Sequence, residues 1–246
     1  MNTEDQNKLF YEENGFLLLK SDFPEEDLSE VAEEILEIFR KNEETSGYSH
    51  GKNKYSRFAT ELHLQNEVFA EFVQREFFFK ICNSLLGRDV DLRFSSTITK
   101  TKEHGAFLDW HQDAIYDRDP SPYINRITCW TAITNSNNEN GCMRLIPGSH
   151  KTGVLKHIES EVYPPNLKCI EIDESKSIPI EMMPGQILVI HPLLAHSSGP
   201  NLSESNRIAM MVGYQKPKLV YKEIEIKWGY RFIKDGQKVW EKLEKK

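Results

Sequence analysis

Apolar residues in the first third of the chain recur at the spacing of an amphipathic helix. After Pro24 and a run of acidic residues they fall at positions 28, 31, 35, 36, 38 and 39, which predicts one apolar helix face. A second helix is predicted over about 67–86, ended by Gly87. Residues 1 to about 88 are therefore interpreted as a helical N-terminal part.

The pattern changes between about residues 89 and 215. Short runs rich in β-branched and aromatic residues, such as INRITCWTAIT, alternate with turn-forming segments such as NSNNENG. Many short strands in succession are typical of a β-sandwich or closed barrel. The predicted fold is mainly β, a jelly-roll (double-stranded β-helix, cupin-like) core with flanking α-helices against one sheet. In the C-terminal extension, 216–246, we predict an amphipathic helix around 230–246.

Length and composition are typical of one globular domain, so residues 1–246 are assigned to a single domain. The 246 residues are 39% hydrophobic and contain no repeat or linker-like segment. No apolar run approaches the roughly 20 residues of a membrane span, and the acidic start is unlike a signal peptide. We therefore expect a cytoplasmic protein without a membrane partner, with its four isolated cysteines reduced and mostly buried.

Charge argues against a nucleic-acid ligand, because a net charge of −7 repels phosphates. Residues 216–246 are the exception, with ten Lys/Arg against five Asp/Glu. Since these charges alternate in sign, we interpret the segment as a solvated surface. The expected partner is a small molecule, and the sequence leaves the oligomeric state open.

The triplet His111-Gln112-Asp113 is a candidate metal-binding motif. Residues two apart on a strand point to the same side, so the imidazole and the carboxylate can share one metal ion. His191 and His196 both follow an apolar strand and a Pro-Gly turn, so position alone does not decide between them. Either would complete a two-histidine, one-carboxylate facial triad, which leaves coordination positions open.

Arg207 follows His196 by eleven residues and begins the next predicted strand. Two adjacent antiparallel strands would present both side chains to one cavity, where the guanidinium forms a bidentate pair with a carboxylate. Taken alone, an arginine at the start of a strand is more often a surface residue.

The combination resembles the phytanoyl-CoA dioxygenase family of Fe(II)- and 2-oxoglutarate-dependent oxygenases. The resemblance covers most of the chain and depends on HQD, CWTAITNSNNENGCMRLIPGSHKTG and MPGQILVIHPLLAHSSGPNLSESNR. It implies that His111, Asp113 and His196 hold the iron.

The same resemblance implies the rest of the cofactor site. It assigns Arg207 to the distal carboxylate of 2-oxoglutarate, Ser198 to a supporting hydroxyl and Trp130 to the wall of the pocket. With Fe(II), 2-oxoglutarate and O₂, such an enzyme oxidises a substrate C–H bond and releases succinate and CO₂. Related halogenases have a small residue in place of Asp113, so hydroxylation is favoured over halogenation.

Strand alternation suggests the substrate contacts. If Trp130 faces the cavity, Thr128 and Arg126 lie on the same side, and Arg126 can bind an anionic group or pair with another residue at the rim. Tyr116 lies where a loop can cover the substrate. Thr97 belongs to a predicted polar face of the strand 92–99, which also carries Arg93, Ser95 and Thr99.

The remaining histidines are not expected to bind the metal. His150, in a Pro-Gly-Ser-His turn, is interpreted as structural. Four others, in polar surroundings, are expected at the surface: His50, His63, His104 and His157.

Two other functions use the same features. A jelly-roll protein that binds a ligand without redox turnover would not require the His/Asp/His set together with Arg207. A metal-dependent hydrolase is possible because zinc accepts the same three ligand types, yet it leaves Arg207 and Ser198 without a role.

Overall fold

The computed structural model describes residues 3–46, 57–102, 105, 107–116, 125–160, 167–217 and 229–243. The helices are α1 (Thr3–Asn14), α2 (Glu25–Ser46), α3 (Glu67–Phe72) and α4 (Glu76–Leu85). The strands are β1 (Phe16–Lys20), β2 (Arg57–Thr60), β3 (Val90–Lys100), β4 (Leu108–His111), β5 (Arg126–Ala132), β6 (Met143–Leu145), β7 (His157–Glu159), β8 (Leu167–Cys169), β9 (Ile178–Ile180), β10 (Gln186–Ile190), β11 (His196–Ser198), β12 (Arg207–Gln215), β13 (Tyr230–Lys234) and β14 (Gln237–Lys242).

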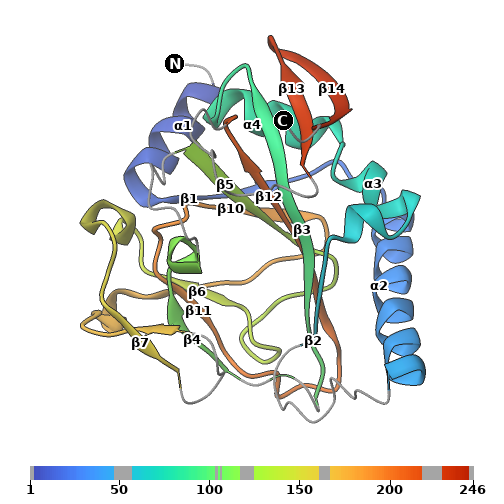
Figure 1. The fold of residues 1–246 in the computed structure, drawn as a ribbon. Helices are drawn as coiled ribbons and strands as arrows, with labels where there is room; N and C mark the ends of the chain where they lie inside the picture. Colours follow the sequence, from blue (N-terminus) through green and yellow to red (C-terminus); the bar gives the residue numbers. More distant parts are fainter. Residues whose placement is uncertain are drawn as a thin grey trace.

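Two antiparallel sheets form the core (Figure 1). The larger has the order β1-β10-β5-β12-β3-β13-β14, with β2 also paired to β3, and the smaller has the order β4-β11-β6-β9. Strands β7 and β8 make a separate two-stranded ribbon. Two facing antiparallel sheets joined by crossing connections are the architecture of a jelly roll, so the predicted fold class is confirmed.

The helices cover the outer face of the larger sheet. The apolar positions of α2 that the sequence predicted, among them Val31, Ile35 and Phe39, are buried in one cluster with outward-facing strand residues such as Cys129 and Tyr214. This burial removes a large apolar area from water and holds the helices against the sheet.

Alternation along β5 sends the other set of side chains into the space between the sheets. Trp130 and Ala132 pack there with Leu188 of the larger sheet and Leu145 of the smaller one. Because successive strand residues point to opposite faces, one strand contributes to both the helix-covered core and the inner space. The candidate site lies in this inner space.

The C-terminal helix predicted around 230–246 is wrong. Residues 230–242 form a hairpin of β13 and β14, and β13 pairs with β3 (Figure 1). The turn between them is Asp235-Gly236 with φ values of 53° and 79°, the positive values that a tight hairpin turn requires. Trp240 stacks on Tyr230 with ring centroids 4.3 Å apart. The apolar residues that suggested a helix therefore pack between the two strands of this hairpin.

The second predicted helix is divided into α3 and α4. At Arg75 the backbone is extended, with φ −60° and ψ 146°, and the side chain forms an ion pair with Asp27 of α2. Helix α1 and strand β1 were not predicted. Tyr11 is the one buried residue of α1. The helix therefore lacks the regular apolar face by which a sequence pattern predicts a helix.

The four cysteines are free and buried, as predicted. Among the described residues, no helix has the length and apolar character needed to cross a membrane.

Gly141 closes the Asn-Gly turn beneath the site and should tolerate no side chain. It has φ +80°, and a Cβ there would lie 2.3 Å from the Gly199 carbonyl oxygen. Gly87 has φ +97° with nothing within 4 Å of a Cβ. We expect Gly141→Ala to lower the free energy of unfolding by about 3 kcal/mol or more and Gly87→Ala by about 1 kcal/mol, measured by urea denaturation. Equal losses would contradict the close approach of the two loops.

Candidate active site

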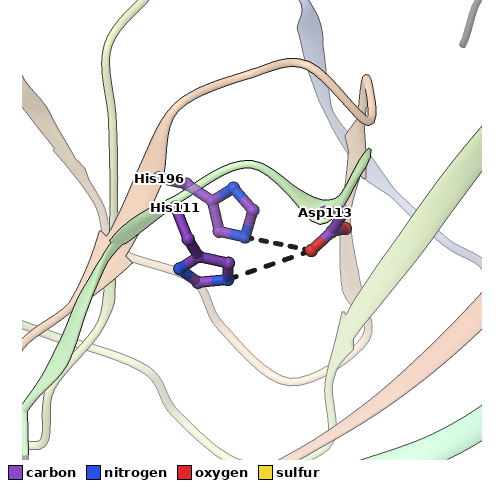
Figure 2. A group of neighbouring side chains, drawn as sticks. All are labelled: His111, Asp113 and His196. Atoms are coloured by element: carbon purple, nitrogen blue, oxygen red, sulfur yellow. Dashed lines mark ion pairs between the residues drawn. The ribbon is translucent and has the colours of Figure 1, made fainter. Parts of the chain in front are cut away.

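His111, Asp113 and His196 come together between the two sheets (Figure 2). His111 ends β4 and lies opposite His196, the first residue of β11, in the strand pairing. Asp113 begins the 3-10 turn that follows β4. Its Oδ1 is 3.5 Å from Nε2 of His196 and 3.9 Å from Nε2 of His111, and one ligand atom from each residue lies within 4.8 Å of the others. One divalent ion can therefore contact all three.

Backbone carbonyls orient both imidazoles. Nδ1 of His111 donates to the Asp109 carbonyl at 2.7 Å, and Nδ1 of His196 donates to the Leu194 carbonyl at 2.9 Å. Because a carbonyl can only accept, Nδ1 of each ring carries a proton, and Nε2 of each ring faces Asp113. Burial and the neighbouring His196 lower the pKa of His111 to about 4, so this imidazole is neutral and able to coordinate at pH 7.

Thr128 of β5 orients the carboxylate. Its Oγ1 donates to Oδ2 of Asp113 at 3.2 Å, and Oδ1 is left directed toward the two histidines. A hydrogen bond of this kind to a ligating group typically tunes and positions the metal site.

Gln112, between the two candidate ligands, points the other way. Its Nε2 donates to the carbonyls of Gly153 and Leu193 at 2.9 and 2.7 Å, and its Oε1 accepts from the Leu155 amide at 2.8 Å. The amide group is fully buried, and both its nitrogen and its oxygen are hydrogen-bonded. It fixes two loops against the strand that carries His111, a structural role that the sequence analysis did not assign.

The two candidate third ligands lie in different surroundings. The Nδ1 of His191 accepts from the Leu193 amide at 3.1 Å, and its ring lies 4.9 Å from that of His150 and 6.1 Å from that of Tyr11. His191 is thus built into the contact between the inner loops and the N-terminal helix. His196 is the histidine that the fold brings to the cluster.

Arg207 is a fully buried cation beside this cluster. Its Nη1 donates to the Gly141 carbonyl at 2.7 Å, and its Cζ lies 5.3 Å from the ring centroid of Trp130. Its Nε has no hydrogen-bond partner among the residues that the structure describes. Burial lowers its pKa to about 10. No carboxylate pairs with it among the residues that the structure describes. Because a buried charge is costly unless it is paired, this end of the cavity is built for an anion.

A second buried cation lies next to it. Lys100 of β3 is directly opposite Arg207 in the strand register, and its ammonium donates to the Ser198 carbonyl at 3.4 Å. Burial and the neighbouring guanidinium lower the pKa of Lys100 well below its usual value. The Oγ of Ser198 is itself buried without a hydrogen-bond partner. The hydroxyl of Ser198 and the charges of Lys100 and Arg207 therefore lie close together.

A cavity of about 560 Å³ joins these groups. Its wall includes the three candidate ligands, Arg207 and Ser198, and also Arg126, Thr128 and Trp130 of β5. Residues two apart on a strand are separated by roughly 7 Å. Along β5, Trp130 therefore marks the arginine end, Thr128 marks the metal ligands, and Arg126 lies on the far side of them.

Thr97 does not line the cavity, so its predicted role is wrong. Its hydroxyl donates to the Ala209 carbonyl of the neighbouring strand at 2.8 Å. A register shift in β3 lies at Arg93. Of the predicted polar face, Arg93 and Ser95 line the cavity and Thr99 does not, while Ser96 and Ile98, from the other set of alternating positions, also line it. A bulge of this kind reverses which residues face inward.

Five other predicted residues have different outcomes. His63 was expected at the surface but is buried, with its Nδ1 2.7 Å from the Ser95 hydroxyl. His157 is half-buried and lies 3.0 Å from the Cys169 sulfur. The side chain of Tyr116 and all of His50 and His104 lie outside the described residues.

Glu61 and Phe58 line the cavity from β2 and the residue after it. Neither was predicted, because no strand was expected there. Glu61 has a left-handed backbone, with φ 54° and ψ 39°, which no sequence pattern indicates.

A sequence model of one protein family, described as Phytanoyl-CoA dioxygenase (PhyH), matches residues 11–209. The chain belongs to the phytanoyl-CoA dioxygenase family. It is 28% identical over 229 residues to the peroxisomal phytanoyl-CoA dioxygenase of Homo sapiens, a match that covers 85% of this chain and 67% of that protein. It is 24% identical over 220 residues to a probable alpha-ketoglutarate-dependent hypophosphite dioxygenase of Stutzerimonas stutzeri, covering 83% and 76%.

A solved structure supports the fold independently. The apo form of ThoJ, a non-heme monooxygenase, has a TM-score of 0.73 and 24% identity, covering 86% of this chain and 77% of that one. The family resemblance found in the sequence is confirmed. The human relative is named as peroxisomal, and the cytoplasmic location of this chain stays a prediction.

Membership in the family fits the geometry. The chain is a dioxygenase that uses Fe(II), 2-oxoglutarate and O₂. Two imidazoles and a carboxylate form a suitable donor set for Fe(II), and the buried guanidinium with its unused Nε fits the carboxylate of a dianionic co-substrate.

The Thr128 hydroxyl should matter to metal binding. Thr128→Val keeps the shape but removes the hydrogen bond to Asp113. We expect it to weaken Fe(II) binding about 10- to 100-fold, the usual effect of losing such a partner. Thr131→Val is the matched control, because the Thr131 hydroxyl on the other face of β5 is buried without a hydrogen bond. Anaerobic Fe(II) titration measures both, and similar losses would contradict the role of Thr128.

Proposed function

We propose that the protein is a hydroxylase that oxidises a C–H bond of a small molecule and converts 2-oxoglutarate to succinate and CO₂. One observation carries the proposal. A two-histidine, one-carboxylate cluster and a buried arginine without a carboxylate partner among the described residues line the same cavity. A hydrolase would need the metal-binding cluster but not the buried arginine. A non-redox binding protein would need neither feature.

His111, Asp113 and His196 are proposed to hold Fe(II), which supplies O₂ activation when bound. The chain prepares the three groups in advance. The carbonyls of Asp109 and Leu194 accept from the two Nδ1 atoms and direct both Nε2 atoms toward the metal position, so neither ring has to turn to coordinate. Three protein ligands leave positions open for co-substrate and O₂.

Arg207 is proposed to bind the distal carboxylate of 2-oxoglutarate. Its planar guanidinium can form two parallel hydrogen bonds to that group, and its free Nε is one of the available donors. Ser198 adds a hydroxyl whose oxygen has no other partner among the described residues, and the guanidinium lies over the ring of Trp130. Buried walls exclude water, which strengthens each of these interactions.

Asp113 supports hydroxylation over halogenation. It fills the position that a halide requires in related halogenases, and Thr128 fixes it there. Arg126 is proposed as a substrate contact, because it lies beyond the metal ligands on β5 and lines the cavity. Tyr116 ends the turn that Asp113 begins and is proposed to lie over the substrate.

Removing one ligand should abolish turnover. We expect His111→Ala, Asp113→Ala and His196→Ala to bind no Fe(II) tightly and to form no succinate from 2-oxoglutarate, because two remaining ligands are too few in an already open site. His191→Ala, the control, should retain both properties. Succinate and CO₂ released with Fe(II) are the readouts. Loss of activity in His191→Ala with full activity in His196→Ala would reverse the assignment, and no 2-oxoglutarate turnover by the wild type would refute the function.

Arg207 should determine the affinity for 2-oxoglutarate. An unpaired carboxylate in a desolvated pocket costs on the order of 2–5 kcal/mol, so Arg207→Ala should raise the dissociation constant about thirtyfold or more. The dissociation constant of Arg207→Lys should lie between those of the wild type and Arg207→Ala, since an ammonium cannot form the two parallel hydrogen bonds. Arg144→Ala, on β6 with its guanidinium bonded to Ser177, is the control. Anaerobic titration of the Fe(II)–2-oxoglutarate absorption band measures the series, and unchanged binding by Arg207→Ala would exclude this role.

A further inference from the structure

Glu61 has a strained backbone in the cavity wall. Of the three non-glycine residues with positive φ in the described chain, Asp235 belongs to the tight β13–β14 turn and Glu171 is exposed outside the cavity wall. Glu61, with φ 54° and ψ 39°, is the one that lines the cavity. This conformation costs free energy in a residue with a side chain, which is a reason to look for a function at that position.

The carboxylate of Glu61 is incompletely satisfied. Its Oε2 is enclosed and accepts no hydrogen bond from the described residues, and Nε2 of His63 is 3.9 Å away, too far for one. The side chain as a whole is 34% exposed, so part of it is open to a ligand in the cavity. Burial raises the pKa of Glu61. A partly desolvated carboxylate of this kind is stabilised by a ligand that donates a hydrogen bond to it.

The wall behind Glu61 is packed firmly. Nδ1 of His63 lies 2.7 Å from the Ser95 hydroxyl, and the rings of Tyr230 and Trp240 meet that of His63 edge-on at 5.7 and 6.5 Å. The β13–β14 hairpin therefore supports the segment that carries Glu61. A carboxylate fixed in a rigid wall loses little freedom on binding, so more of its interaction appears as affinity.

The strand register places Glu61 across the larger sheet from the metal ligands. Strand β2 pairs with β3, β3 with β12 and β12 with β5, so three strand spacings separate β2 from β5. Thr60 lies in one row with Trp130, and Glu61 is one position further along, toward the row of Thr128. Since neighbouring strands are about 4.8 Å apart, Glu61 and Thr128 are separated by roughly 14 Å along the sheet, which is the upper limit of the straight distance between their backbones. Thr128 holds Asp113, so the metal ligands mark the opposite end of this path.

The surface along this path is largely apolar. Gly213 of β12 is opposite both Phe94 and Thr128, and a Cβ at Gly213 would collide with the Phe94 ring. The ring therefore lies over the bare backbone of β12, between Thr128 and β2. Phe94 and Met211 of β12 both line the cavity. A ligand that extends from the metal ligands to Glu61 passes over hydrocarbon, which favours an apolar chain or ring.

We propose that Glu61 selects an elongated, largely apolar substrate that carries a hydrogen-bond donor, an ammonium or a hydroxyl group, at the end remote from the oxidised carbon. The carboxylate accepts the donor while the C–H bond lies at the metal ligands. This inference rests on the proposed function, because Fe(II) and 2-oxoglutarate must occupy the end of the cavity that holds His111, His196 and Arg207. The contact needs no second charged group on the substrate.

Straight-chain probes test the donor. Amines, alcohols and methyl ethers with hexyl, octyl and decyl chains are titrated anaerobically, by calorimetry, into the protein with Fe(II) and 2-oxoglutarate. We expect the amines or the alcohols to bind about tenfold more tightly than the ethers of the same length, because an ether has no proton to donate to Glu61.

The position of oxidation tests the arrangement. With O₂ present, mass spectrometry of the products should place the new hydroxyl group several carbons away from the amine or alcohol, because the apolar path separates Glu61 from the metal ligands. Oxidation confined to the carbon next to the donor would contradict the proposal.

Three variants locate the contact. Glu61→Gly removes the acceptor and relieves the strain, so its thermal midpoint should equal or exceed that of the wild type while the preference for donors over ethers is lost. Glu61→Gln keeps an acceptor without the charge, so a loss of about tenfold identifies an ammonium ligand and a loss below about threefold a hydroxyl ligand. Glu171→Gln, at an exposed position with the same kind of backbone, is the control and should bind all probes as the wild type does.

Failures of the two proposals are separable. If Fe(II) and 2-oxoglutarate give no absorption band and no basal succinate, the proposed function fails. If the band forms but the ethers bind as tightly as the amines and the alcohols, or no probe binds, the donor-bearing substrate is excluded. A Glu61→Gly protein that still prefers donors as the wild type does would exclude Glu61 as their acceptor.

Discussion

The pairing of β4 with β11 is the constraint on which the site depends. It brings residues 85 positions apart, His111 and His196, directly opposite each other. The ring centroids are then 4.2 Å apart, and Asp113 needs only one short turn to reach both. Because the two strands belong to the smaller sheet, whose partner sheet carries Thr128, closing the sandwich also supplies the hydrogen bond that orients the carboxylate.

Whether a buried polar group has its hydrogen bonds within the protein distinguishes the structural residues from the candidate functional ones. Gln112 uses its donor and acceptor atoms on three backbone groups, and such a satisfied network rigidifies a fold. By contrast, atoms of Arg207, Ser198 and Glu61 are buried without a hydrogen bond from the described part of the chain, and all three residues line the cavity. Unsatisfied groups are costly in a folded chain, so their concentration at one cavity indicates that ligands complete them.

Strand β5 links stability to function. Its outward residues, such as Cys129, pack under the helices, while Arg126, Thr128 and Trp130 point inward at successive positions of the cavity. The same strand therefore fixes the distance between the Arg207 end and the Arg126 end of the cavity.

Local patterns in the sequence were sufficient to predict the apolar face of α2, the β-rich core and the His-x-Asp triplet. They also predicted that Arg126, Thr128 and Trp130 lie on the same side of their strand. These depend on residues near each other in the chain, where periods of 3.6 and 2 apply directly. The rest needed tertiary structure. Residue spacing could not separate His196 from His191, because strand pairing makes that choice, and it misplaced Thr97 because a bulge in β3 reverses the inward face. The left-handed Glu61 likewise follows from how β2 meets β3, a contact between distant segments that no local period encodes.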